Sequence, residues 1–299
     1  MNTSLPLVSV IGLCYNHERF IREALESVRQ QTYGAIELII VDDASTDQSI
    51  AVIRSFLQEI EADDNIKTCF LPENLGNCAA FNRGLALAQG KYVIDFATDD
   101  IMLPERITQQ VSFFEALDET YGVIFSEAQY IDEDGRPLRY HYRDWLKHIY
   151  PIPTGDIYAR LLSTYFIAAP TMMMRKQVLD ELGGYNEQLA YEDFDFWIRS
   201  ARDYRYAYQD ICATQIRKHD HSMSASLYRR GDSQLYSTYL VCLKAKELNR
   251  TEEERRALIQ RVQYELRQAL WGRNWREAKL LFNLWGNLQT MVFYSQQSA

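Results

Sequence analysis

The sequence lacks the cysteine patterns that cross-link small domains or bind zinc. It has five cysteines among 299 residues, an odd number, and no two of them form a CxxC pair. A disulfide framework or a zinc knot is therefore disfavoured. We expect small buried thiols in a reducing compartment.

Long apolar runs are also missing. No run approaches the roughly 18–20 residues needed to span a bilayer. The N-terminus has neither the basic start nor the small-residue cleavage site of a secretory signal. We therefore expect a cytoplasmic protein.

Positive charge is in deficit. The chain has 32 Lys and Arg against 41 Asp and Glu, a net charge of −9 at pH 7. A nucleic-acid-binding protein needs a basic stripe to neutralise phosphates, so we expect no nucleic-acid partner. The acidic balance leaves room for a metal ion that neutralises an anionic substrate. Hydrophobic residues make up 47% of the chain, which suits a globular protein of one large domain or one domain with an appendage.

The first hundred residues alternate between short apolar runs and amphipathic stretches. The runs predict buried strands over 7–13, 36–41, 66–71 and 92–96, and the stretches predict helices between them. We expect Ser45 or Thr46 to cap the second helix, and Gly90 to end a third helix over 76–89. This alternation predicts right-handed βαβ units and a parallel sheet.

The alternation weakens after residue 100. We expect a helix opened by Pro104, a strand over 122–126 and a hairpin that turns at Asp134-Gly135. A further strand is expected within 167–174 and a helix within 191–203. From about Tyr228 the chain is strongly helical, and Thr251 precedes three glutamates that start one of these helices.

Acidic pairs follow two of the predicted strands. They are Asp42-Asp43 and Asp99-Asp100, and Tyr15-Asn16 follows the first strand. The carboxyl ends of parallel strands meet at one edge, where ligands bind. Neither GxGxxG nor GxxxxGK[ST] is present to hold phosphate, so a diphosphate at this edge needs Mg²⁺ or Mn²⁺ as a bridge. The alternative is that both pairs only form turns and helix starts.

Five segments together resemble the family 2 glycosyltransferases of the GT-A fold. They are Val8–Asn16, Ser27–Asp47, Asn74–Val93, Ala97–Ile107 and Tyr191–Arg199, in the family's order within residues 5–225. The resemblance implies an α/β, Rossmann-like, mostly parallel sheet flanked by helices. It implies a GT-A domain over 1–225, with a nucleotide-binding half at about 1–100 and an acceptor half at 101–225. A helical C-terminal extension over 226–299 follows.

The same resemblance implies an inverting transfer of a sugar from a nucleoside diphosphate donor, UDP- or dTDP-linked, to an acceptor hydroxyl. The acceptor would be a carbohydrate, a lipid-linked molecule or a protein, in the synthesis of cell-surface polysaccharide, glycolipid or glycoprotein. In matching family members Asp43 would recognise the base, and Leu13, Tyr15 and Asn16 would lie against it. Asp99 would contact the ribose. The alternative function is a sugar-nucleotide-binding scaffold of the same fold that has lost catalysis.

The resemblance also implies a divalent metal, Mn²⁺ or Mg²⁺, held by Asp100. Many members carry an acid where this chain has Ala97, whereas the spore-coat branch of the family shares the alanine, so fewer carboxylates are available here. Arg217 and His219 lie in a segment that resembles the family's Arg-x-His loop over the diphosphate, and His219 is a second candidate metal ligand. A mobile polar loop is the alternative.

An inverting transfer needs a base to take the proton of the acceptor hydroxyl. The resemblance assigns this role to Asp193, with Glu192 as the second candidate. A helix N-terminus would lower the pKa of both carboxyls, whereas desolvation beside Trp197 would raise it. The alternative is a helix-starting acidic pair followed by a solvated Asp195.

The C-terminal extension is rich in apolar residues. We expect its helices to pack on the catalytic domain, and a homodimer or a peripheral contact with the inner face of the membrane is also compatible. The residues that suggest a surface role are three tryptophans and four cations: Trp271, Trp275, Trp285, Arg267, Arg273, Arg276 and Lys279.

Overall fold

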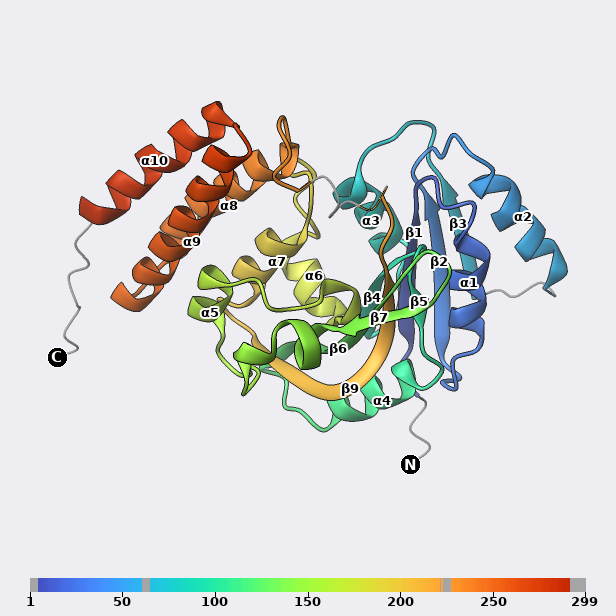
Figure 1. Ribbon diagram of the computed structural model, residues 1–299. Coiled ribbons are helices and arrows are strands. Elements are labelled where there is room, and N and C mark those ends of the chain that lie inside the picture. The colour runs from blue at the N-terminus through green and yellow to red at the C-terminus, as the bar shows by residue number, and fades with distance from the viewer. Residues whose placement is uncertain (1–4, 61–64, 221, 223–226, 291–299) are drawn as a thin grey trace. The chain divides into compact units, whose positions relative to one another are not determined.

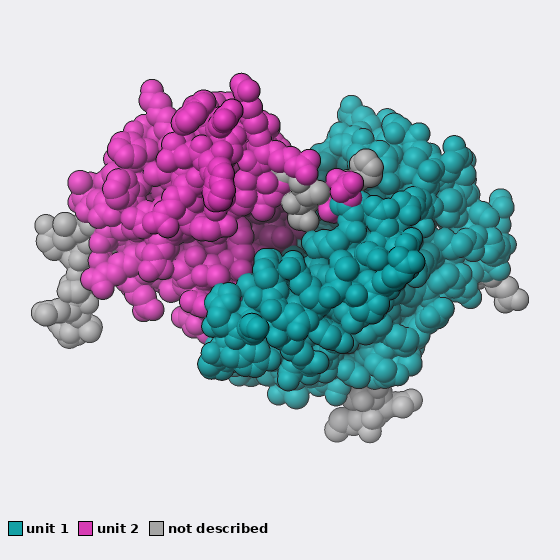
Figure 2. Space-filling model, in the orientation of Figure 1, with its two compact units in different colours: residues 1–155, 167–188, 204–219 teal, residues 156–166, 189–203, 220–299 magenta. Residues whose placement is uncertain are grey.

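The structure is a computed structural model that describes residues 5–60, 65–220, 222 and 227–290 (Figure 1). The chain divides into two compact units, coloured separately in Figure 2. The first unit comprises residues 1–155, 167–188 and 204–219, and the second comprises 156–166, 189–203 and 220–299. The predicted α/β class is confirmed.

A single sheet forms the centre of the first unit. Its strands in the described chain are β1 Val8–Cys14, β2 Ile36–Asp42, β3 Ile66–Phe70, β4 Tyr92–Ala97, β5 Ile101–Met102, β6 Tyr121–Ile131, β7 Pro137–Tyr140, β8 Met173–Arg175 and β9 Arg205–Arg217. The strand order is β3-β2-β1-β4-β8-β6-β9-β5, and β7 pairs with β6. The strands β3, β2, β1 and β4 are parallel, β8 is antiparallel to both its neighbours, and β6 and β9 are parallel.

Helices of both units are visible in Figure 1. The first unit contains α1 Ile21–Arg29, α2 Ser49–Glu59, α3 Asn77–Leu85, α4 Arg106–Glu115 and α6 Lys176–Leu182, with the short turns η1 His141–Trp145, η2 Lys147–Ile149 and η3 Ala169–Thr171. The second unit contains α5 Tyr158–Ser163, α7 Asp193–Ser200, α8 Ser233–Leu248, α9 Glu252–Trp271 and α10 Trp275–Thr290. None of the described helices is long and apolar enough to cross a membrane.

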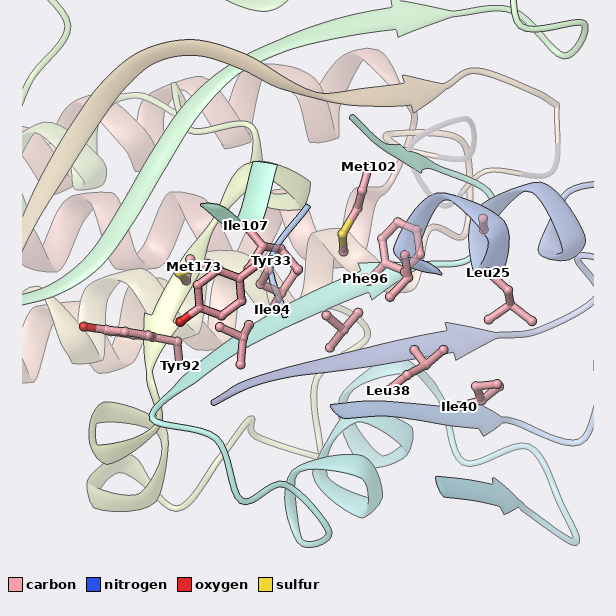
Figure 3. Packing of buried hydrophobic residues seen from close by; sticks show 14 of the residues in the cluster. Leu25, Tyr33, Leu38, Ile40, Tyr92, Ile94, Phe96, Met102, Ile107 and Met173 are labelled. Carbon is pink, nitrogen blue, oxygen red and sulfur yellow. The ribbon is translucent and has the colours of Figure 1, made fainter. Parts of the chain in front are cut away.

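The core of the first unit lies against one face of the parallel strands. Leu38 of β2 and Ile94 of β4 are buried together with Leu25 of α1 and Ile107 of α4 (Figure 3). Alternate residues of a strand point to the same face, so these positions bury one apolar surface under two helices. This packing fixes the strand ends, from which the site loops emerge.

Three local expectations differ from the structure. The helix α2 begins after Gln48, not at a Ser45 or Thr46 cap. The helix α3 ends at Leu85, and Gly90 instead approaches the next strand so closely that a Cβ there would lie 2.6 Å from Ser9 N. The thirteen-residue strand β9 was not predicted, because polar residues and register shifts against β6 break its alternation.

Other expectations are confirmed. The hairpin turns where β6 meets β7, and Gly135 there has a φ of 80°, which glycine adopts without strain. Thr251 and Glu254 form a capping box at the start of α9. The predicted C-terminal helices are present, and in the second unit α5 and α7 join them.

Candidate active site

The strand order places a topological switch point between β1 and β4. The chain runs from β1 outward to β2 and β3, and then returns to the other side of β1 as β4. In open α/β sheets, ligands bind outside the carboxyl ends of the strands at such a point. Thr98, the first residue after β4, ties the end of β4 to β1, because its N–H and hydroxyl donate to Leu13 O at 3.0 and 2.9 Å.

The end of β1 and the loop after it carry three predicted base-contacting residues. Leu13 is buried, whereas the Tyr15 side chain is 46% exposed and free to stack on a planar ring. Asn16 has a φ of 58°, a left-handed conformation that Asn tolerates better than most residues. Its Oδ1 accepts the Thr46 N–H at 2.8 Å, so the side chain fixes this loop against the one after β2.

The two aspartates at the end of β2 are held in different ways: Asp42 is the last residue of the strand and Asp43 the first residue after it. The Asp43 carboxylate accepts the N–H of Leu75 at 2.7 Å and of Gly76 at 2.9 Å, which leaves one lone pair on each oxygen for another donor. Asp42 Oδ1 accepts the Ser45 N–H at 2.9 Å, and Oδ2 is buried with no hydrogen-bond partner among the described residues. Asp43 is therefore a preoriented acceptor, and its contact with a base stays a prediction.

The loop after β4 carries a buried pair of carboxylates. Asp99 Oδ2 lies 2.9 Å from His219 Nε2, and Asp100 Oδ1 accepts the Arg217 N–H at 2.9 Å. Burial raises the pKa of Asp99, but His219 and the charge of His17 bring it below its usual value. Burial and the charge of Asp99 hold the pKa of Asp100 well above its usual value. Asp100 is thus a carboxylate whose negative charge is poorly compensated.

Arg217 is predicted to face the diphosphate, and the structure engages its guanidinium with the protein itself. Nε donates to Asp99 O at 2.9 Å, and NH1 donates to the carbonyls of Asp132 and Glu133 at 3.2 and 3.0 Å. NH2 pairs with Glu23 at 2.6 Å. Arg217 therefore joins β9 to the β4 loop, the hairpin and α1, and a phosphate contact stays a prediction.

Two residues at this edge were missed by sequence reasoning. The half-buried His17 places Nδ1 2.9 Å from Thr98 Oγ1, and desolvation lowers the pKa of its ring. Arg106 on α4 is buried; NH2 donates to Met172 O at 3.2 Å, and NH1 has no hydrogen-bond partner in the part of the chain that the structure describes. The position of His17 directly after Asn16 could have suggested it, and Arg106 lies within the segment Ala97–Ile107 that carries the family resemblance.

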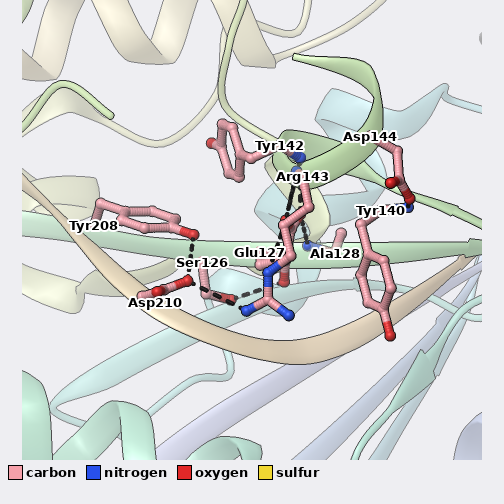
Figure 4. A network of polar contacts seen from close by, with 9 residues as sticks. All are labelled: Ser126, Glu127, Ala128, Tyr140, Tyr142, Arg143, Asp144, Tyr208 and Asp210. Carbon is pink, nitrogen blue, oxygen red and sulfur yellow. Dashed lines mark hydrogen bonds and ion pairs between the residues drawn. The ribbon is translucent and has the colours of Figure 1, made fainter. Parts of the chain in front are cut away.

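A third missed residue, Glu127 of β6, is fully buried. Its carboxylate accepts the N–H of Ala128 and Tyr142, both at 2.9 Å, and of Arg143 at 3.1 Å (Figure 4). These partners are backbone groups of β6 and η1. Glu127 therefore holds η1 against the sheet and has a structural role.

The two candidate catalytic bases, Glu192 and Asp193, belong to the second unit. Glu192 is the N-cap of α7 and Asp193 its first residue, and both side chains are half-buried. The preceding Tyr191 places its hydroxyl 2.7 Å from Thr238 Oγ1 of α8 and 3.2 Å from the hydroxyl of Tyr165. The turn that carries both candidate bases is therefore attached to α8 from its N-terminal side.

A second attachment lies beyond the pair. Asp195 is buried rather than solvated, and its carboxylate accepts Arg199 Nε at 2.6 Å and Lys244 Nζ of α8 at 2.5 Å. Upstream, Ala190 N–H donates to Ser237 Oγ of α8 at 2.9 Å. Contacts on both sides of Glu192 and Asp193 thus fix the turn to one helix of the C-terminal extension.

The family model for glycosyl transferase family 2 matches residues 9–183, more than half of the chain. The chain therefore belongs to glycosyltransferase family 2, and the predicted enzyme class is confirmed. An uncharacterized glycosyltransferase of Methanocaldococcus jannaschii is 29% identical over 210 residues, 67% of each chain. The putative teichuronic acid biosynthesis glycosyltransferase TuaG of Bacillus subtilis is 29% identical over 226 residues, covering 75% of this chain and 84% of TuaG.

A third relative is longer than this chain. The uncharacterized glycosyltransferase of Rickettsia felis is 28% identical over 256 residues, which are 85% of this chain but 41% of the relative.

Solved structures confirm the GT-A fold. S. aureus TarS 1-349, in complex with UDP-GlcNAc, superposes with a TM-score of 0.70 at 20% identity, over 94% of this chain and 80% of that one. The mannosyltransferase PcManGT of Pyrobaculum calidifontis, in complex with GDP-Man and Mn2+, gives a TM-score of 0.65 at 18% identity, over 98% and 77%.

Proposed function

We propose that this chain is an inverting glycosyltransferase that moves a sugar from a UDP- or dTDP-linked donor to an acceptor hydroxyl. The acceptor belongs to cell-surface polysaccharide, glycolipid or glycoprotein synthesis. The observation that carries the proposal is the buried Asp99-Asp100 pair at the β1/β4 switch point, where the charge of Asp100 is poorly compensated. The name of TuaG supports the polysaccharide class, and the complex of TarS with UDP-GlcNAc supports a UDP-linked donor.

In this proposal the nucleotide lies across the loops that follow β1, β2 and β4. Tyr15 stacks on the base, supported by Leu13 and Asn16, and Asp43 accepts a hydrogen bond from the base through its unused lone pairs. Asp99 contacts the ribose. Both Asp43 and Asp99 are held by other protein groups, so little conformational entropy is lost on binding.

The residues at this edge fit a divalent metal. Among the described residues no group of three or more His, Cys, Asp or Glu could hold one, so the protein would supply one or two ligands. Asp100 would be the main ligand and His219 the second candidate, a donor set that suits Mn²⁺ or Mg²⁺ with phosphate oxygens in the other positions. When bound, the metal would neutralise the diphosphate that leaves.

Asp193 acts as the base. Its carboxylate takes the proton of the acceptor hydroxyl while that oxygen attacks the anomeric carbon. The bond from the anomeric carbon to the diphosphate oxygen breaks with its electron pair, and attack from the opposite side inverts the centre. Glu192, its neighbour at the start of α7, is the second candidate.

The test is release of nucleoside diphosphate by the full chain, measured with a panel of UDP- and dTDP-sugars and with polysaccharide, lipid-linked and peptide acceptors. We expect turnover with at least one of these donors in Mn²⁺ or Mg²⁺, and none in EDTA. Binding of the donor without turnover across the panel would instead support the scaffold function.

A further inference from the structure

The tip of the α9–α10 hairpin exposes large apolar side chains that a folded protein normally covers. The exposed fractions are 47% for Leu270, 85% for Trp271 and 65% for Trp275. These residues lie within six positions of the chain, around the turn between α9 and α10. Phe282, on α10, is also exposed, with an exposed fraction of 56%. Clusters of this kind mark surfaces that contact another molecule or a membrane.

The charge of the tip is opposite to that of the protein. Residues 267–279 contain four cations and one anion, Glu277, in a chain of net charge −9. All four cations are exposed: Arg267, Arg273, Arg276 and Lys279. A partner that complements this tip must therefore present negatively charged groups next to an apolar surface.

The backbone of the tip holds one of these cations in an unusual conformation. Arg273 has a φ of 58°, the left-handed region that glycine usually fills at the end of a helix. The adjacent Gly272 cannot take a side chain, because a Cβ there would lie 2.3 Å from Tyr228 O. The tip therefore keeps an arginine at a position that glycine would occupy with less strain.

We propose that this tip is a peripheral docking site for an anionic lipid surface. Tryptophan places its apolar ring and its N–H at the boundary between lipid tails and headgroups, and arginine and lysine bind anionic headgroups. A contact of this kind needs no spanning helix, consistent with the described helices. An anionic bilayer has negatively charged headgroups directly above apolar lipid tails. These two features complement a tip that combines four cations with two exposed tryptophans.

The experiment is co-sedimentation of the full chain with vesicles of phosphatidylglycerol or of phosphatidylcholine, without donor or acceptor. We expect binding to the anionic vesicles, weakened at high salt and much lower with phosphatidylcholine. The double variant Trp271→Ala/Trp275→Ala should lose at least roughly tenfold in binding, from the apolar area withdrawn from the interface. Because no sugar nucleotide is present, failure here leaves the proposed transfer reaction standing.

Matched variants separate docking from folding. Arg273→Gly should keep or raise the Tm, because glycine suits the left-handed turn, and should weaken binding about fivefold. Arg267→Ala should weaken binding by a similar factor, whereas Arg256→Ala, an exposed cation near the other end of α9, should not.

Two outcomes would overturn the docking site. The first is equal binding of the wild type and the double tryptophan variant to anionic vesicles. The second is a homodimer that the tryptophan substitutions dissociate while no form of the chain binds vesicles, which would assign the tip to a second copy.

Discussion

Two buried acids in the first unit, one near each end of the parallel strands, have opposite surroundings. Glu37, near the start of β2, accepts from Ser9 Oγ, Lys67 Nζ and the N–H of Gln89 and Gly90. Burial raises the pKa of Glu37, but these donors bring it below its usual value. At the other end, burial and Asp99 keep the pKa of Asp100 well above its usual value. Glu37 thus accepts hydrogen bonds from four donors, whereas Asp100, the proposed metal ligand, has a negative charge that its surroundings compensate poorly.

The largest effect should come from Asp100→Asn. Loss of the charge that would hold the metal should reduce transfer by about 10³-fold or more, since electrostatic stabilisation of developing charge is worth several kcal/mol. The Tm should stay the same or rise, because a raised carboxyl pKa means that the ionised form costs folding stability at neutral pH. Activity assays and thermal melts would check both. A strong loss of stability would mean that Asp100 resembles Glu37.

Asp193→Asn adds the proposed base, which belongs to the second unit, to the comparison. We expect nucleotide affinity to be retained and transfer to fall by about 10²–10⁴-fold, the usual contribution of a general base. Single-turnover rates and nucleotide titrations would separate the two. Glu192→Gln is the matched control, and a larger loss in that variant would transfer the role of base to Glu192.

Glu37→Gln should affect stability and not chemistry. Loss of the charge leaves Lys67, which is partly exposed, without its anionic partner and should cost about 2 kcal/mol at pH 7. The folded-state pKa is depressed, so this stabilisation is present above the unfolded value of 4.5 and is lost as the pH falls through the folded value. Urea unfolding should show a gap between wild type and variant at pH 7 that narrows towards pH 3. If Glu37→Gln reduced the transfer rate as strongly as Asp100→Asn does, the distinction between a structural acid at Glu37 and a functional acid at Asp100 would be contradicted.

The smallest effect should come from removing a contact between α8 and the turn that carries Glu192 and Asp193. Tyr191→Phe removes the hydroxyl bonded to Thr238 and should cost about 1 kcal/mol of stability. If the contact also orients Asp193, kcat should fall several-fold while the donor KM stays constant. Thr238→Ser, which keeps the hydroxyl, should retain the wild-type kcat, and a KM change alone would argue against an orienting role.

Sequence reasoning reached the features that depend on local pattern. The parallel strands, the acids at their carboxyl ends, the hairpin at Gly135 and the start of a helix after Thr251 all follow from short-range signals. It missed β9, whose alternation is broken, and could not find contacts made across long stretches of chain. Arg217 lies 117 residues from Asp100, and nothing in either segment indicates that one would hold the other.

The central claim is that the acidic edge of the sheet is a metal-dependent site for a nucleoside diphosphate. The most direct test is the Tm of the full chain with UDP, dTDP, GDP or CDP, each with Mn²⁺ and with EDTA. At one hundred times its dissociation constant a ligand adds about 2.7 kcal/mol of stability. We predict a rise in Tm with UDP or dTDP that EDTA and Asp100→Asn each abolish. No rise with any nucleotide, or a rise that EDTA leaves unchanged, would contradict the claim.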